Sequence, residues 1–279
     1  MISPPGSQSR TTVESLVLHA TLDESGKFSD KDIIAACGFL TTRNVWNAYN
    51  LAWSEFLIRS DIEYLHVSEL MRWDGIYAPK KDTLGAHGRD LIFTEAVKTI
   101  CSVLPRRSVP IAVVLDAKAF RSLDSESRRR LGKPNLIVFQ LFIGSILGYI
   151  ARTKKDYVLS LVCDDDETMA GQLYLILCKS KVANPDAKRR IRSICFTDDT
   201  IYYPLQAADL FSHICYSEME RQMNHQTRPV AELYRTLWKA FGEFEGAFIN
   251  SEHLSDISAP IPRAIDLRST FPPLDEGPR

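Results

Sequence analysis

Acidic side chains follow separate apolar segments of this chain. Asp23 and Glu24 come directly after the first apolar run, and Asp164–Glu167 come directly after a later one. Asp209 lies in a helical pattern further on. Converging carboxylates repel one another unless a cation lies between them. If folding brings these acids together, their hard oxygen ligands predict a Mg²⁺ or Mn²⁺ site for phosphoryl chemistry.

Each acidic segment also has a simpler explanation. The Asp-Glu-Ser-Gly sequence that begins at Asp23 favours a turn, and Asp164–Glu167 could cap a following helix. Asp209 is harder to explain in this way, because it lies among apolar residues and a buried acid needs a partner. Gln206 lies one turn before it on the same helical face, so a hydrogen bond between these two side chains is the structural alternative.

The middle acid of the set is ambiguous. Asp164 follows its strand most closely, but Asp165 or Asp166 could point inward instead, because neighbouring residues on a strand face opposite sides. Asp116 also ends an apolar run and is a rival ligand.

The expected elements alternate between strands and helices. Apolar runs of strand length occupy residues 16–22, 33–40, 109–115, 156–163 and 191–196. Helical patterns occupy residues 44–60, 89–104, 134–151, 167–182, 204–222 and 230–241. Residues 65–88 are expected to be irregular and residues 122–133 to form a charged loop.

This order predicts a mixed α/β sheet flanked by helices. The first two strands are expected to form an antiparallel hairpin. Three strands, a helix and then a strand with acids at its tip is also the order of a ribonuclease-H-like domain, with a helical insertion at about residues 41–107. We expect a single domain over residues 15–250, a disordered tail at 1–14 and an extended tail at 251–279.

The stretch at residues 136–151 is almost entirely apolar. It spans about 16 residues, which is short of the ~20 that cross a bilayer, so it predicts a buried core helix rather than a membrane span. No membrane partner is expected.

The composition limits the other classes of function. The formal net charge is −1, so no overall field attracts nucleic acid, although basic clusters at 106–107, 128–130 and 188–190 could contact a backbone locally. Six cysteines without a C-x-x-C pair indicate core thiols in a reducing cytoplasm rather than a zinc site. Phosphate-binding loops and the nucleophile elbow of hydrolases are absent from the sequence.

Three segments carry a resemblance to a known family. They are Leu-Asp-Glu-Ser-Gly at 22–26, His-Val-Ser-Glu-Leu at 66–70 and Leu-Gln-Ala-Ala-Asp-Leu at 205–210. The chain resembles the DUF3800 family of ribonuclease-H-like proteins over about residues 16–215. The resemblance implies a ribonuclease-H-like fold and a metal-dependent nuclease or related phosphoryl-transfer role. Asp23, Glu24 and Asp209 match the family motifs directly, and Asp164 fits the middle acid.

One departure concerns the helix that follows the third strand. Ribonuclease-H enzymes usually place a Glu there, whereas residues 136–151 contain no acid. Glu24 or Glu69 could substitute, or the site could hold one metal. His66 and Glu69 are spaced to share a helical face, and His66 could act as a general acid or base or contact a phosphate.

The resulting hypothesis is a cytoplasmic, divalent-metal-dependent nuclease. Asp23, Asp164 or Asp165, and Asp209 would be the metal ligands. Glu24 would assist as a ligand or base, and Gln206 would orient Asp209 or the substrate. The alternatives are a non-catalytic module that binds nucleic acid or protein, and a hydrolase of a small phosphorylated molecule.

Overall fold

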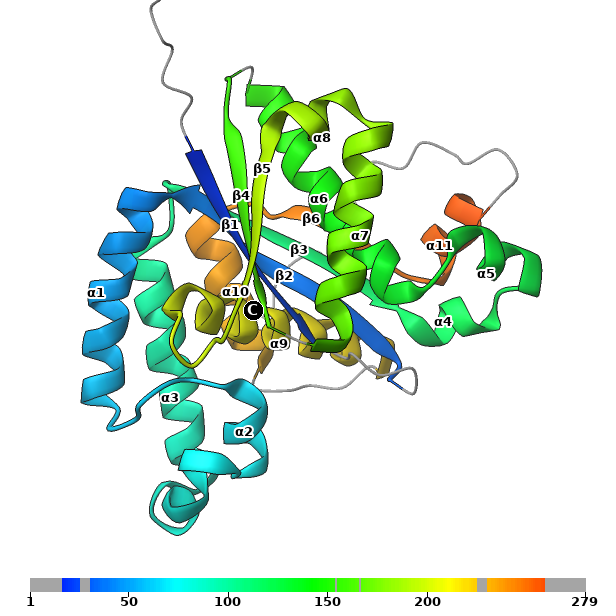
Figure 1. Ribbon diagram of the computed structural model, residues 1–279. Helices are drawn as coiled ribbons and strands as arrows, with labels where there is room; N and C mark the ends of the chain where they lie inside the picture. The colour runs from blue at the N-terminus through cyan, green and yellow to red at the C-terminus, as the bar shows by residue number, and fades with distance from the viewer. Residues whose placement is uncertain (1–16, 26–30, 154, 166, 225–229, 259–279) are drawn as a thin grey trace, which may run out of the picture.

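The computed structural model describes residues 17–25, 31–153, 155–165, 167–224 and 230–258 (Figure 1). The tail expected at residues 1–14 lies outside these ranges, as do residues 26–30 of the expected hairpin connection.

Within the described residues six strands form one mixed sheet in the order β5-β4-β1-β2-β3-β6. The strands are β1 (Val17–Ser25), β2 (Ile33–Thr42), β3 (Ser108–Asp116), β4 (Val158–Asp164), β5 (Ile191–Thr197) and β6 (Glu245–Ile249). β1, β2 and β3 are consecutive antiparallel neighbours, whereas β4 is parallel to β1 and β5 is parallel to β4. This is the ribonuclease-H-like arrangement predicted from the sequence.

The predicted helical insertion lies between β2 and β3. It contains α1 (Arg43–Arg59), α2 (Val67–Arg72), the 3₁₀ helix η1 (Gly75–Lys80) and α3 (Lys81–Val103). Residues 65–88, expected to be irregular, are therefore largely helical. Apolar residues of this segment, including Leu65, Leu70 and Tyr77, belong to one buried core with residues of α1 and α3. Tertiary packing therefore stabilises helices that are individually short.

Three further elements differ from the expectations. The charged loop expected at 122–133 contains α5 (Ser125–Leu131), which Asp124 caps by accepting hydrogen bonds from the N–H groups of Glu126 and Ser127. β6 was missed, because Glu-Gly-Ala-Phe-Ile is short and lacks strand alternation. Ser251–Ser258, which was expected to belong to an extended tail, forms α11, and the rest of that expected tail lies outside the described residues.

The two faces of the sheet carry separate apolar cores. Leu18, Ala20 and Leu22 of β1 pack with residues of α6 (Pro134–Thr153) and α7 (Glu167–Ala183). The other face packs against α1, α3, α9 (Tyr203–Asn224) and α10 (Val230–Phe241), and Figure 1 shows these helices on the side of the sheet away from α6 and α7. Because side chains alternate along a strand, Asp23 belongs to the α9 face.

Helix α6 is the long apolar helix noted in the sequence. It is the one helix in the described ranges that is long and apolar enough to cross a membrane. Here Phe142, Ile146 and Ile150 are fully buried and pack against the sheet. A buried face of this kind is typical of the core helix of a folded domain.

Candidate metal centre

The carboxyl ends of three parallel strands meet at one edge of the sheet. In the β1–β4 pairing Leu22 lies opposite Cys163, and in the β4–β5 pairing Asp164 lies opposite Thr197. The next residues along these strands are Asp23 on β1 and Asp198-Asp199 after β5. The register therefore brings acids from positions 23, 164 and 198–199 to the same edge.

The alternation of side chains distinguishes Asp164 from its neighbours. Leu161 and Cys163 pack on the α6 face, so Asp164 lies on the same face as Asp23. Asp165 is exposed, and its backbone N–H donates to the carbonyl of Thr197 at 3.1 Å. Asp166 lies outside the described residues. Of the two described candidates, the backbone thus favours Asp164 as the inward acid.

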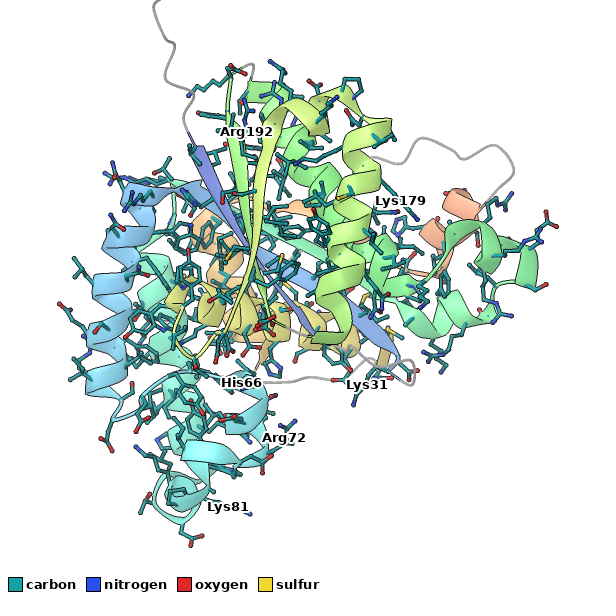
Figure 2. The ribbon with its side chains drawn as sticks, in the orientation of Figure 1. Lys31, His66, Arg72, Lys81, Lys179 and Arg192 are labelled. Atoms are coloured by element: carbon teal, nitrogen blue, oxygen red, sulfur yellow. The ribbon has the colours of Figure 1, made fainter. Side chains whose placement is uncertain are left out.

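Helix α9 supplies the next acid. The Asp209 side chain is only 8% exposed, and its Oδ2 accepts a 2.7 Å hydrogen bond from the backbone N–H of Val67. One ligand atom each from His66, Asp199 and Asp209 lies within 4.8 Å of the others. Figure 2 shows His66 at the lower edge of the sheet, above α2.

Asp199 is the member of this cluster that the sequence reasoning missed. Burial, together with the negative charges of Asp209, Asp164 and Asp198, raises the pKa of Asp199 to about 7, although His66 opposes the shift. Asp199 follows β5 just as Asp164 ends β4, so the rule that acids at strand ends can form a site would have identified it. The raised pKa also shows that the Asp164 and Asp209 carboxylates lie near enough to act on Asp199.

His66 is held by a small network on α2. Its Nδ1 lies 3.5 Å from Glu69 Oε1, and its Nε2 lies 3.1 Å from the hydroxyl of Ser68. The hydroxyl of Tyr64 donates to Glu69 Oε2 at 2.9 Å. Gly75, at φ +57°, leaves room for this carboxylate, because a Cβ there would lie 2.4 Å from Glu69 Oε2. His66 thus lies beside Glu69, although it precedes α2 with an extended backbone instead of sharing a helical face with Glu69.

The side chain of Gln206 forms hydrogen bonds with other partners than the expected Asp209 or substrate. Its side chain is fully buried, and its Oε1 accepts hydrogen bonds from Trp53 Nε1 at 2.7 Å and from the Leu65 N–H at 3.0 Å. Its Nε2 donates to the carbonyl of Asp199 at 2.8 Å. These contacts attach α1, the segment before His66 and the β5–α9 loop to α9. Gln206 thus positions the backbone around the acids.

Asp116 and the basic cluster before β5 lie apart from this site or serve the fold. Asp116 ends β3, two strands from β1, and caps α4 (Ala117–Ser122) by accepting from the Ala119 N–H at 2.7 Å. Glu24 pairs through its backbone with Ala36, and the placement of its side chain lies outside the description. In the basic cluster before β5, Arg189 pairs with Asp156 and Asp186.

Comparisons with known proteins add little to this geometry. No family model matches the sequence, and no curated protein matches it. One similar solved structure is the crystal structure of Bst-RNase HIII in complex with Mn²⁺, at a TM-score of 0.43 and 13% sequence identity. The match covers 88% of this chain and 71% of that one. A likeness at this level assigns no activity to the present chain. The candidate site therefore depends on this chain's own strand order and on its cluster of carboxylates and a histidine.

Proposed function

We propose that this chain is a divalent-metal-dependent nuclease of the DUF3800 kind. The observation that carries the proposal is the meeting of Asp209, Asp199 and His66 within 4.8 Å, at the sheet edge where β1 and β4 present Asp23 and Asp164. Buried acids at such spacing are costly unless they share protons or a cation. The site lies beyond the carboxyl ends of parallel strands, where ligands bind in open α/β sheets.

The donor set fits Mg²⁺ or Mn²⁺. Asp23, Asp164, Asp199 and Asp209 offer carboxylate oxygens, which both ions prefer, and His66 lies beside them without serving as a ligand in this proposal. The raised pKa of Asp199 supports this fit, because a cation would stabilise the charged carboxylate that burial, and then the neighbouring acids, disfavour. When bound, such an ion supplies Lewis-acid stabilisation of a phosphoryl oxygen and an acidified water.

His66 is the residue that we expect to move a proton at this site. Glu69 faces its Nδ1, and a carboxylate in that position favours the tautomer with the proton on Nδ1. Its Nε2 then accepts from Ser68 or faces the acids. Gln206 takes no part in chemistry in this proposal, because its polar atoms are engaged in the fold.

The lack of an acid on α6 does not weaken the proposal. α6 packs on the face of the sheet opposite to Asp23, whereas Asp199 reaches the cluster from the β5–α9 loop. Asp199 thus provides a fourth carboxylate in addition to those of Asp23, Asp164 and Asp209. For this reason we favour an active nuclease over a non-catalytic module. All six cysteines are free thiols, in keeping with the cytoplasmic location that we also propose.

The test is cleavage of labelled single-stranded RNA, single-stranded DNA, both duplexes and an RNA–DNA hybrid. Each substrate is incubated with Mg²⁺, Mn²⁺ or EDTA. Asp23→Asn and Asp164→Asn are expected to abolish metal-dependent cleavage with the fold intact. Asp165→Asn is the matched control, since it removes one charge from the exposed neighbour of Asp164 and is expected to retain activity.

Two results would contradict the proposal. Cleavage that persists in EDTA or in Asp23→Asn would exclude the carboxylates as its source. A folded wild-type protein that cleaves none of these substrates and gains no thermal stability from Mn²⁺ would favour the non-catalytic module instead.

A further inference from the structure

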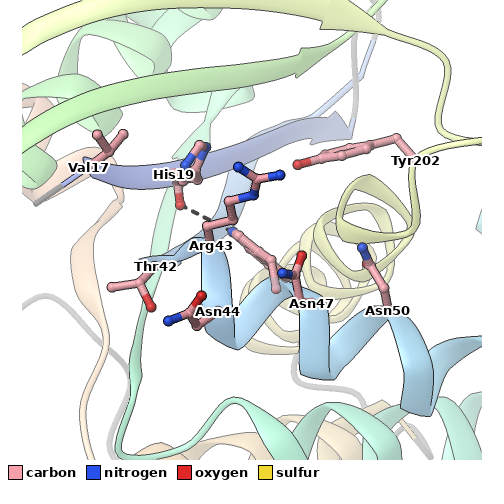
Figure 3. Close-up of a pocket in the computed structure, with 9 residues that line it drawn as sticks. Val17, His19, Thr42, Arg43, Asn44, Asn47, Asn50 and Tyr202 are labelled. Atoms are coloured by element: carbon pink, nitrogen blue, oxygen red, sulfur yellow. Dashed lines mark hydrogen bonds between the residues drawn. The ribbon is translucent and has the colours of Figure 1, made fainter.

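A pocket of about 550 Å³ opens between α1, the start of β1 and the loop that precedes α9. Its polar lining includes His19, Arg43, Asn47, Asn50 and Tyr202, and we call it the Arg43 pocket. Figure 3 shows the amides of Asn47 and Asn50 on α1 facing the same space as the Arg43 guanidinium, which lies between His19 and the hydroxyl of Tyr202. Since α1 belongs to the helical insertion, one wall of this pocket is built by the insertion rather than by the sheet.

Two elements, β1 and the β5–α9 loop, contribute residues to both the Arg43 pocket and the metal centre. His19 and Asp23 lie four residues apart on the same face of β1, a separation of about 13 Å along the strand. Tyr202 follows Asp199 by three residues on the β5–α9 loop. A polymer whose reacting group lies at the acids would therefore reach the Arg43 pocket within a few of its monomers.

The charge of the pocket is opposite to that of the metal centre. No acidic side chain lines it, and within the described ranges no ion pair engages Arg43. Burial, and then the charge of Arg43, lower the pKa of His19, which disfavours a second positive charge beside Arg43. Arg43 is thus left as an available cation, and a guanidinium is suited to binding a phosphate with two hydrogen bonds.

The neutral groups beside Arg43 suit a base rather than a second phosphate. Arg43, Asn47 and Asn50 recur at helical spacing and share a face of α1. Asn47 and Asn50 both line the pocket, and a side-chain amide can form hydrogen bonds with the edge of a base. The ring of Tyr202 offers an aromatic surface of the kind on which unpaired bases stack.

We propose that the Arg43 pocket binds one unpaired nucleotide of a single-stranded nucleic acid, with its phosphate on Arg43 and its base toward Asn47, Asn50 and Tyr202. A paired base cannot enter such a pocket, because its edge is already engaged and its faces are stacked. A role for this pocket in placing a substrate for cleavage rests on the proposed nuclease function. Binding itself needs neither the metal nor the reaction.

The experiment measures fluorescence anisotropy of labelled 12-nucleotide single-stranded RNA, single-stranded DNA and a duplex of the same sequence, in EDTA over a range of salt concentrations. Arg43→Gln is expected to weaken single-strand binding by about tenfold and to reduce the slope of log K against log salt by about 0.7. Asn47→Ala, at an exposed position, is expected to weaken binding without changing the slope. Arg59→Gln, at the far end of α1, is the matched control and is expected to bind like the wild type.

The outcomes separate this proposal from the nuclease assignment. Arg43→Gln binding with wild-type affinity, a wild-type protein that binds no single strand, or a duplex bound as tightly as the single strand would each overturn it. If cleavage is lost in Asp23→Asn but single-strand binding is unaffected by Arg43→Gln, the nuclease stands and the pocket proposal fails. If nothing is cleaved but single-strand binding depends on Arg43, the pocket proposal stands without the nuclease.

Discussion

The backbone N–H of Val67 donates a 2.7 Å hydrogen bond to the carboxylate of Asp209, 142 residues later in the chain. Three residues before Asp209, Gln206 accepts a hydrogen bond from the N–H of Leu65. Together these bonds fix both sides of His66 to α9. The position of the histidine beside the acids therefore depends on the same helix that carries one of those acids.

Asp209→Asn is expected to separate metal binding from folding. An asparagine oxygen can still accept from Val67, so the far-ultraviolet circular dichroism should be unchanged. In the wild type, Mn²⁺ at 100 times its Kd should stabilise by about 2.7 kcal/mol, which corresponds to a rise in Tm of roughly 5–10 °C. The variant should lose most of this rise in a thermal shift assay. Asp165→Asn should keep it, and a full rise in Asp209→Asn would remove Asp209 from the ligand set.

Asp199 predicts a pH dependence of stability in the absence of metal. Its pKa is raised to about 7 in the folded protein, so between about pH 4 and pH 7 the folded state binds a proton that the unfolded state has released. Stability from this group is therefore present at pH 5 and is lost as the pH rises through 7. Urea unfolding in EDTA at pH 5 and pH 8 measures the effect.

The Asp199→Asn variant provides the control for that measurement. It should remove most of this pH dependence, because the asparagine does not titrate. Adding Mn²⁺ should reverse the trend in the wild type, since the ion displaces the proton and binds more tightly at higher pH. A stability that rises from pH 5 to pH 8 without metal, equally in both proteins, would contradict the role given to Asp199.

Gln206→Leu tests whether Gln206 acts in the fold or in the chemistry. The leucine would leave the buried indole N–H of Trp53 and the N–H of Leu65 without their acceptor. A loss of about 2–4 kcal/mol in the free energy of unfolding is expected from these two donors, measured by urea titration. A variant with wild-type stability but no turnover would instead support the catalytic role predicted from the sequence.

Gly38→Ala tests the close contact between β2 and β1 beside the metal centre. A Cβ at Gly38 would lie 1.8 Å from the carbonyl oxygen of Thr21, two residues before Asp23. The strands would have to separate, so we expect a loss of stability on the order of 3 kcal/mol and weaker Mn²⁺ binding. Gly144→Ala on α6 is the control, because a Cβ there meets nothing within 4 Å and should stabilise by up to about 1 kcal/mol.

The sequence predicted the sheet better than it predicted the insertion. Long apolar runs such as those of β2 and β4 identify strands because their side chains are buried on both faces of the sheet. The segment that contains α2 and η1 lacks such a pattern, because these short helices are stabilised by contacts with distant residues, including the bond between Gln206 and Leu65.

The candidate site was predicted in part for a similar reason. The strand ends identified Asp23 and Asp164, and the late helical motif identified Asp209. Asp199 was missed although its strand was expected, because Thr197 and Asp198 separate it from the end of the apolar run at 191–196. The part assigned to Gln206 could not be decided from its helical spacing, since its hydrogen-bond partners come from α1, the loop before α2 and the β5–α9 loop.

The sequence by itself determined which residues could form a metal centre and the order of elements that carries them, because hydrophobic periodicity and residue chemistry are local properties of a chain. Only the tertiary structure decided which acids meet. The register of β1, β4 and β5 selects Asp164 over the exposed Asp165, and the hydrogen bond between Asp209 and Val67 fixes His66 beside Asp199. Strand register and contacts over 142 residues depend on the packing of the whole chain, which no local pattern records.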